Sequence, residues 1–404
     1  MEQICKYDQC TGCSACINIC PKSAITMTAQ GPLGDIHPSI NQDLCINCHF
    51  CAKICPVNNL IDKKYPLNAY ALIAKDKEDL LSSSSGGASS LLAQAAIVDG
   101  GVVYGCVEND YHDIAHRRID SISDLALIKK SKYVQSNINY IYKDVRKNTI
   151  EGRHVLFFGT PCQVAGLKSY LQKDYENILL VDLVCHGVPS QKLLRQDVER
   201  RLDSIGADHD GVTVIFREKV GTPGKKDGVN IIFGLFLKDK NGRDILFRDS
   251  GRVGDDFYIT AFFNALIFRD CCYHCEYARP ERVGDITIAD FWGIGETSVP
   301  KENGISLVLV NTSRGKKALE RITSNARFEE RNIEEGIKGN RNLQCPSILP
   351  PERNKFISEY IVDNDNACNR YMRPIHRKRR LVRLLLKLHL LSLASRIKAK
   401  LINK

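Results

Sequence analysis

Short apolar stretches, separated by polar turns, recur through the middle of the chain. They occupy residues 69–74, 102–104, 154–158, 178–184 and 306–311. Each has the length of a buried strand, and apolar residues at helical spacing fill some of the intervals between them. One such interval joins 154–158 to 178–184, so these strands should be parallel and linked by a right-handed crossover. The pattern predicts an α/β domain.

The flanking regions have other patterns. Residues 24–28 and 36–40 can pair as a hairpin across a Gly/Pro-rich turn, and residues 61–67 read as a linker. Further strands are expected at 212–217 and 229–237, and a helix at 257–268. The resulting division of the chain is 1–60, 68–150, 151–345 and 373–404.

Eight cysteines form two copies of one motif near the N-terminus. Each copy reads C-x2-C-x2-C-x3-C and is followed by proline, and the copies are offset by 35 residues. Thiolate is the soft ligand that iron–sulfur clusters require, and the fourth cysteine of each copy ligates the other copy's cluster. We therefore expect one [4Fe-4S] cluster on Cys10, Cys13, Cys16 and Cys55, and a second on Cys45, Cys48, Cys51 and Cys20. Zinc sites usually have other spacings, and disulfides are typical of secreted chains.

The charge of the chain is concentrated at its C-terminus. The net charge is +10, and residues 373–404 hold eleven Lys or Arg and no acid, so the remainder is near −1 (10 − 11). A leucine-rich helix in this tail would carry Leu381, Leu384, Leu385, Leu388 and Leu391. Such a basic amphipathic helix can lie on an anionic membrane or a partner, or close onto the body as a solvated terminal helix. Because the tail lacks interleaved aromatic residues, nucleic acid is not an expected partner.

The remaining composition favours a cytoplasmic protein. The first ten residues are polar and run directly into the cysteine motif, unlike a secretory signal. No apolar stretch has the length of a membrane span. Clusters are assembled where thiols stay reduced, so we expect a cytoplasmic location, with membrane association possible through the tail.

Four further cysteines form a second candidate site. Cys162 and Cys185 should follow neighbouring parallel strands at their carboxyl ends, the edge where ligands collect in open α/β sheets. Cys272 and Cys275 form a C-x2-C pair. The four could hold a third [4Fe-4S] cluster or zinc, although distant cysteines are often buried small hydrophobes. Cys5, Cys106, Cys271, Cys345 and Cys368 are read as structural.

A Ser/Gly-rich turn lies between two of the predicted strands. Ser85, Gly86 and Gly87 precede residues at helical spacing. A turn that opens a helix presents free N–H groups and the positive helix end, which suits a phosphate. A plain N-cap or a flexible linker would have the same sequence.

Several motifs together resemble the coenzyme F420 hydrogenase/dehydrogenase beta-subunit family. They are Ser85-Gly86-Gly87, Gly159-Thr160-Pro161-Cys162-Gln163, Cys185-His186-Gly187, Cys272-Tyr273-His274-Cys275 and Asp290-Phe291-Trp292-Gly293. The resemblance covers residues 68–320 in both halves of the family's catalytic region. It implies an α+β ferredoxin-like 2[4Fe-4S] module followed by an α/β flavin and iron–sulfur catalytic domain.

The resemblance also implies site roles. Cys162, Cys185, Cys272 and Cys275 would ligate a third cluster, with Cys272 and not Cys271 in register. Ser85, Gly86 and Gly87 would contact FAD, and Thr160 and Pro161 would lie beside cluster and flavin. Lys132, Tyr133 and Gln135 are in another family-like stretch, which is a flavin or substrate contact or an ordinary surface strand.

These implications predict a flavin-dependent iron–sulfur oxidoreductase. Electrons from a ferredoxin or other redox protein would pass the clusters to FAD and reduce an organic small molecule, or flow in reverse. His186 would deliver a proton or be a structural histidine. Phe291 and Trp292 are expected in the core. The alternatives are an F420-dependent oxidoreductase subunit and a non-catalytic electron-transfer subunit.

Overall fold

The computed structural model describes residues 2–221, 229–245 and 256–387. An eight-stranded sheet crosses the body of the molecule in the order β12-β3-β11-β10-β7-β6-β4-β5. Its strands are β3 (Asn68–Ala74), β4 (Val102–Glu108), β5 (Ile114–Ile119), β6 (Val155–Gly159), β7 (Ile178–Leu183), β10 (Ile286–Asp290), β11 (Ser306–Val310) and β12 (Ala326–Arg331).

The middle of the sheet is parallel and its margins are antiparallel. β10, β7, β6 and β4 run in the same direction, and the crossover predicted between β6 and β7 is confirmed. Every residue of β6 is buried, as expected for a strand covered on both faces. β5, β11, β3 and β12 pair antiparallel. The predicted α/β character of the body is therefore confirmed.

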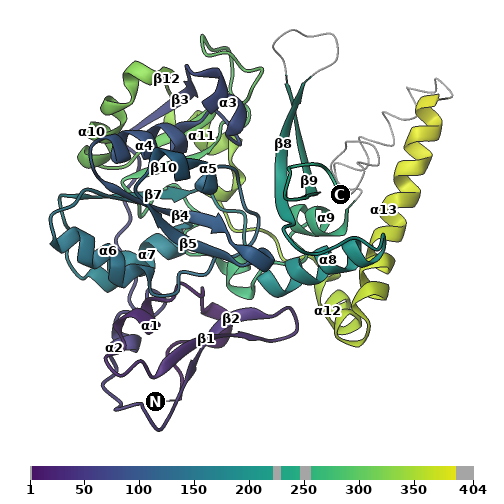
Figure 1. Cartoon of the computed structure of the whole chain (residues 1–404), viewed down its shortest axis with the longest axis horizontal. Helices are drawn as coiled ribbons and strands as arrows, with labels where there is room; N and C mark the ends of the chain where they lie inside the picture. Colours follow the sequence, from purple (N-terminus) through teal and green to yellow (C-terminus); the bar gives the residue numbers. More distant parts are fainter. Residues whose placement is uncertain (1, 222–228, 246–255, 388–404) are drawn as a thin grey trace.

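Helices cover both faces of the sheet (Figure 1). α4 (Ala88–Val98) and α10 (Ser313–Arg321) pack together on one face. α6 (Ile141–Ile150) and α7 (Pro161–Leu171) pack together on the other. Shorter helices complete the body: α3 (Lys77–Ser82), η2 (Asp110–His112), η3 (Ile122–Asp124), α5 (Leu125–Ile128), η4 (Asp270–His274), η5 (Thr323–Asn325), α11 (Ile333–Gly339) and η6 (Arg341–Leu343).

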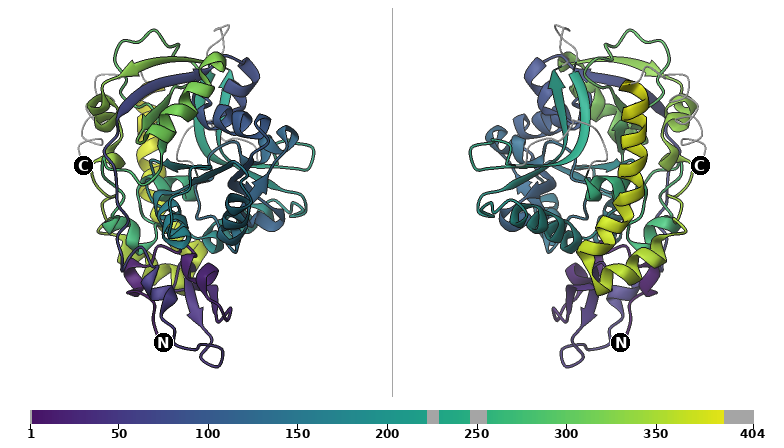
Figure 2. Two further views of the ribbon diagram at one scale, coloured as in Figure 1. Left: turned by 90° about the vertical axis from the view of Figure 1, so that its left-hand side faces the viewer. Right: turned by 90° about the vertical axis from the view of Figure 1, so that its right-hand side faces the viewer.

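The N-terminal module projects from one end of the molecule, beside α6 and α7 (Figures 1 and 2). β1 (Ile25–Gln30) and β2 (Asp35–Ile40) form the predicted antiparallel hairpin. The module also contains η1 (Tyr7–Gln9), α1 (Ala15–Ile19) and α2 (Phe50–Lys53). α1 contacts both α6 and α7, so the cysteine motifs lie directly under one face of the sheet.

A second lobe packs beside the sheet around its own hydrophobic core. It consists of α8 (Gln191–Asp203), β8 (Thr213–Gly221), β9 (Val229–Lys238), α9 (Phe257–Phe263), α12 (Arg353–Val362) and α13 (Asn364–Lys387). β8 and β9 form an antiparallel hairpin separate from the main sheet. The helix predicted over 257–268 is shorter, because Ala265 adopts a left-handed backbone with φ 54°.

The C-terminal helix is long and extends along the side of the molecule (Figure 2). Leu381 and Leu384 are exposed on α13, whereas Leu388 and Leu391 lie outside the described residues. A membrane or partner role for this helix stays a prediction. Among the described residues, no helix combines the length and apolar character needed to cross a bilayer.

Candidate iron–sulfur and cofactor site

Two small cavities in the N-terminal module are lined by cysteines, and Cys5 joins the four motif cysteines at the first of them. The inner cysteine set, Cys10, Cys13, Cys16 and Cys55, lines one cavity. The outer cysteine set, Cys20, Cys45, Cys48 and Cys51, lines the other. In each set three cysteines come from one motif copy and the fourth from the other copy, the arrangement that the spacing predicted. The two sets share a small hydrophobic core, so the cavities are adjacent.

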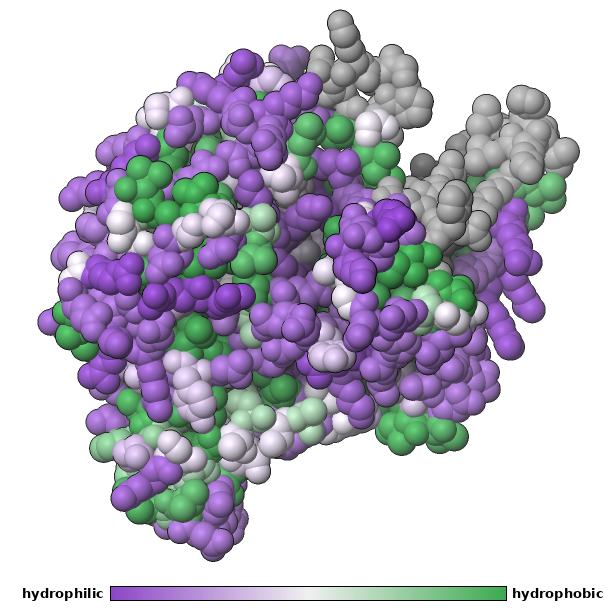
Figure 3. All heavy atoms as spheres, viewed as in Figure 1, coloured by the Kyte–Doolittle hydropathy of each residue, from purple (hydrophilic) through white to green (hydrophobic). Residues whose placement is uncertain are grey.

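The outer set lies near the surface. Cys48 is exposed, and so are the neighbouring side chains of Ile46 and Phe50. Hydrophobic side chains are visible on this end of the molecule in Figure 3. The outer set is therefore the cysteine set best placed to face another protein.

The cysteines fit an iron–sulfur cluster better than isolated thiols. Burial raises the pKa of both Cys13 and Cys185 to about 12, so a thiolate at either position needs a cation to stabilise it. The four thiols of each N-terminal set surround a cavity. In the described part of the chain, no three His, Cys, Asp or Glu side chains gather closely enough for one metal ion.

A third cysteine set gathers at the carboxyl edge of the sheet. Cys162 lies in the first turn of α7, which follows β6, and Cys185 follows β7. Since β6 and β7 are parallel neighbours, both residues reach the predicted edge. The Thr160 hydroxyl, at the start of α7, is 3.2 Å from the sulfur of Cys162.

The C-x2-C segment reaches this edge through a buried ion pair. Arg282 donates to Asp182 Oδ1 at 2.8 Å, and neither side chain is more than 1% exposed. The same guanidinium donates to the carbonyl oxygens of Tyr277 and Leu183. Asp182 lies on β7 shortly before Cys185, so this pair holds the segment after η4 against the end of β7.

Cys271 and Cys272 have different surroundings. Burial raises the pKa of Cys162, Cys185 and Cys275, and the charge of Cys271 raises all three further. Cys272 packs against aromatic side chains at and beyond the end of α9. The resemblance assigned the ligand role to Cys272. In the structure, however, it is the charge of Cys271 that acts on the other three thiols. We therefore define the third cysteine set as Cys162, Cys185, Cys275 and the Cys271–Cys272 pair.

The inner and third sets share one hydrophobic core. Cys13 belongs to the same buried cluster as Tyr142 and Tyr277, and Cys162 and Cys275 pack against that cluster. Burial raises the pKa of both phenols, and the negative charges of cysteines from both sets raise it further. The two sets are therefore neighbours across the boundary between the N-terminal module and the body.

A close approach at Gly166 of α7 brings these sets together. A Cβ atom at this position would lie 2.9 Å from the Cβ of Cys13 and 3.0 Å from its sulfur. Hydrogen bonds from Asn18 to the Asn139 carbonyl at 2.8 Å, and from Ser169 to the Ile54 carbonyl, join the same surfaces.

A cavity much larger than those of the N-terminal module adjoins the third set. It has a volume of about 290 Å³. It is lined by Cys185, by the Ser/Gly-rich turn at residues 83–87 (the serine turn), by residues 129–134 and by the ends of β6, β7 and β10. Ser85, Gly87 and Thr160 line it, whereas Gly86 and Pro161 are not among the lining residues. The serine turn opens α4, as the sequence predicted, and it also faces the cavity.

Gly86 has a packing role. A Cβ atom there would lie 2.0 Å from the Leu72 carbonyl oxygen and 2.6 Å from the Ser306 nitrogen. The Ser85 hydroxyl donates to the Ile305 carbonyl at 2.8 Å. The turn is therefore wedged between β3 and β11.

The other predicted site residues divide between two places. His186, Lys132 and Tyr133 line the cavity. The Lys132 ammonium donates to the Lys129 carbonyl at 2.8 Å, and burial lowers its pKa. Gln135 instead points to the module boundary, where it donates to the Thr11 carbonyl at 3.0 Å. Phe291 is buried as predicted, whereas Trp292 is 45% exposed and lines the cavity, so its predicted core position is wrong.

Three polar cavity residues, His116, Ser136 and Arg217, were not found from the sequence. His116 is buried, and its ring contacts the Phe158 carbonyl and the Ser136 hydroxyl. Burial lowers the pKa of His116 to about 4, so its ring is neutral at physiological pH. Arg217 of β8 binds Asp290 through two hydrogen bonds, of 2.7 and 2.9 Å. No local motif marks these residues, because distant segments bring them together.

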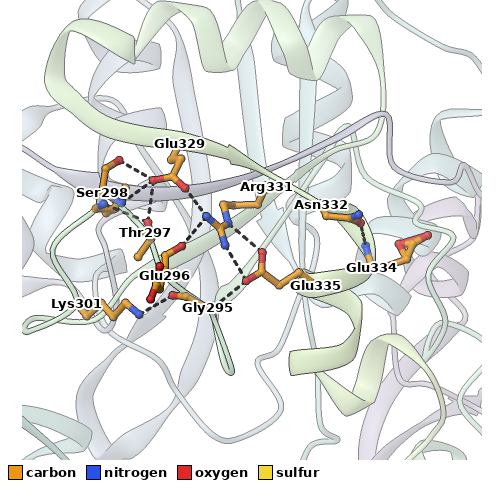
Figure 4. Close-up of polar contacts among 11 residues, drawn as sticks. Gly295, Glu296, Thr297, Ser298, Lys301, Glu329, Arg331, Asn332, Glu334 and Glu335 are labelled. Atoms are coloured by element: carbon orange, nitrogen blue, oxygen red, sulfur yellow. Dashed lines mark hydrogen bonds and ion pairs between the residues drawn. The ribbon is translucent and has the colours of Figure 1, made fainter.

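An ionic network holds the loop that carries Trp292 (Figure 4). Arg331 of β12 donates to the Glu296 carbonyl at 2.9 Å and to both carboxylate oxygens of Glu335. Glu329 accepts from the backbone and hydroxyl of Ser298. The loop after β10 is thereby fixed to β12 and α11 at the edge of the cavity.

Comparisons with known proteins agree with this arrangement. Residues 9–59 match a family model described as 4Fe-4S dicluster domain. Residues 152–336 match the model for the C terminus of the coenzyme F420 hydrogenase/dehydrogenase beta subunit. No curated protein matches the chain significantly. A chain of the F420-reducing [NiFe] hydrogenase complex from Methanosarcina barkeri is similar, with TM-score 0.42 and 18% identity, over 75% of this chain and 91% of that chain. Residues 152–336 thus carry the C-terminal domain of the coenzyme F420 hydrogenase/dehydrogenase beta subunit, an oxidoreductase family, and residues 9–59 carry a 4Fe-4S dicluster domain.

Proposed function

We propose that this protein is a flavin-dependent iron–sulfur oxidoreductase that passes electrons between a ferredoxin-type protein and an organic small molecule. The observation that carries the proposal is a row of four sites. The outer set adjoins the inner set, the inner set adjoins the third set, and the third set adjoins the large cavity. Such a row supports single-electron transfer from the surface to a buried reaction site.

In this proposal the cysteine thiolates hold three [4Fe-4S] clusters. The inner and outer sets hold two, and Cys162, Cys185, Cys275 and one thiol of the Cys271–Cys272 pair hold the third. Bound clusters would carry single electrons, and bound FAD would exchange them for a two-electron reduction. The protein positions the thiols and keeps bulk water from the inner sites.

The large cavity is the proposed FAD site. The positive end of α4, which begins beside the cavity, suits the phosphates. Gly86 would contribute by allowing the turn to pack closely against the backbones of β3 and β11. Pro161 would contribute as the first residue of α7, the helix that carries Cys162. His116 and His186 are the imidazole groups at this cavity. Burial lowers the pKa of both rings, to about 4 for His116, but the charge of Asp290 partly opposes this effect at His186, which is therefore the better proton donor of the two.

Anaerobic purification with iron, sulfide and flavin analysis tests the proposal. We expect about twelve irons, from three four-iron clusters, and about one FAD per chain. Cys162→Ser should lower the iron count by about four. Cys345→Ser, which replaces a cysteine outside all three sets, is the matched control and should keep all the iron.

Other outcomes identify the alternatives. Iron and sulfide without flavin would contradict the proposal and indicate a non-catalytic electron-transfer subunit. Reduction of F420 by the purified protein would indicate an F420-dependent subunit. Full iron retention in Cys162→Ser would contradict the proposed third cluster.

A further inference from the structure

A buried arginine lies between the inner and third cysteine sets. Arg269 is 1% exposed and directly precedes η4, the helix that contains Cys271 and Cys272. Its Nε donates to the Cys10 carbonyl at 2.7 Å. Its own carbonyl accepts from the Cys272 nitrogen at 2.9 Å. One residue therefore connects the backbone of an inner-set cysteine to the backbone of the third set.

The guanidinium has two further partners. It donates to Gln135 Oε1 at 3.0 Å and contacts His37 Nε2 at 3.1 Å. Since arginine can only donate, Nε2 of His37 must accept, and His37 is neutral in this contact. All three acceptors of Arg269, including the Cys10 carbonyl, are thus neutral groups. None of these hydrogen bonds cancels the positive charge of the guanidinium.

This charge acts on cysteines of both sets. Cys10, Cys271 and Cys272 all interact electrostatically with Arg269, as does the carboxylate of Asp35. His37 also hydrogen-bonds the thiol of Cys10. The imidazole therefore links the guanidinium of Arg269 to the Cys10 sulfur.

We propose that Arg269 is a positioning residue that sets the spacing between the inner-set and third-set clusters and raises the reduction potential of the inner one. The inference rests on the proposed function, because it requires clusters at both sets. A reduced cluster carries one more negative charge than an oxidised one, so a nearby cation in a low-dielectric region stabilises the reduced form. The transfer moves one electron from one cluster to the other, with no bond formed or broken and no proton moved.

Redox titration of the intact protein, followed by electron paramagnetic resonance, tests this role. In Arg269→Gln we expect about twelve irons and an inner-cluster midpoint lowered by about 59 mV or more, a tenfold change in the ratio of oxidised to reduced cluster. Arg269→Lys keeps the charge and should restore most of the shift. The outer cluster, which Arg269 does not touch, should keep its midpoint in both variants.

Two controls make the result decisive. Arg201→Gln replaces another buried arginine, which pairs with Asp197 and Asp256 in the second lobe, and should leave all midpoints unchanged. His37→Phe keeps a ring stacked on Tyr7 but removes the nitrogen that accepts from Arg269, so it should lower the inner midpoint by a smaller amount.

The outcomes separate the two proposals. Unchanged midpoints in Arg269→Gln, with iron retained, would overturn the role of Arg269 and leave the proposed function intact. If Arg269→Gln fails to fold, unchanged midpoints in His37→Phe would overturn it instead. A wild-type protein without clusters would contradict the proposed function itself.

Discussion

The outer and third cysteine sets flank the inner set but are built in different ways. The outer set comes from residues 20–51, in one small module, and includes the exposed Cys48. The third set draws its cysteines from three segments between residues 162 and 275, which the sheet and the Arg282–Asp182 pair bring together. The outer set therefore depends on local loops, whereas the third set depends on the folding of the whole body.

The largest effect is expected from breaking the buried ion pair between Arg282 and Asp182. Arg282→Gln leaves the Asp182 carboxylate buried without its cation, which should lower the free energy of unfolding by about 3–5 kcal/mol. Urea unfolding followed by the fluorescence of Trp292, the single tryptophan, measures this effect. The third set should lose its iron before the outer set does.

A neighbouring arginine provides the control for this variant. Arg279 is 44% exposed and pairs with Glu276 at the surface. Arg279→Gln should change the free energy of unfolding by only about 0.2–1 kcal/mol. Equal effects of the two substitutions would contradict the role assigned to the buried pair.

A smaller effect is expected at the boundary between module and body. Gly166→Ala places a methyl group against Cys13, so the module must shift, at a cost of about 1–3 kcal/mol. The gain in helix propensity, about 1 kcal/mol, offsets part of this cost. Thermal unfolding and the magnetic coupling between clusters should both change.

Gly221→Ala is the matched substitution for this test. At Gly221, a Cβ atom would meet nothing within 4 Å among the described residues. This variant should behave like the wild type in both measurements. A Gly166→Ala protein with the same coupling as the wild type would show that the two sets are not in contact.

The smallest effect on the body should come from the outer set. The double variant Cys45→Ser/Cys48→Ser should remove about four irons. Because these cysteines lie in the projecting module, the unfolding transition reported by Trp292 should shift by less than about 1 kcal/mol. A larger shift would mean that the module and the body unfold as one unit.

The cysteines that the spacing grouped together line the two N-terminal cavities, because regular spacing within one module leaves little freedom in how they meet; Cys5, which also lines the inner cavity, had no such spacing. The cysteines of the third set could be grouped only by predicting the sheet topology, because it is the parallel pairing of β6 and β7 that brings Cys162 and Cys185 to one edge. Sequence could not choose between Cys271 and Cys272, which differ by one position in a short helical turn. Arg269 and Arg282 were also missed, because their partners are distant in sequence.

Three strands of the main sheet, β5, β10 and β12, were not predicted from the sequence. The two outermost ones escaped prediction for a related reason. β5 and β12 lie at the margins of the sheet, and β12 carries the charged sequence Ala-Arg-Phe-Glu-Glu-Arg. Edge strands often carry charge, which protects them from pairing with other chains, and this hides them from an apolar pattern. The end of α9 was misplaced because the left-handed turn at Ala265 has no glycine to mark it.

The serine turn shows how the sheet itself prepares a binding surface. Gly86 is held between the backbones of β3 and β11, and Ser85 is tied to Ile305. Because these contacts hold the turn in one shape before any ligand arrives, a ligand bound there would cost the protein little conformational entropy. Affinity at this end of the cavity should therefore depend on the ligand's own flexibility more than on any rearrangement of the protein.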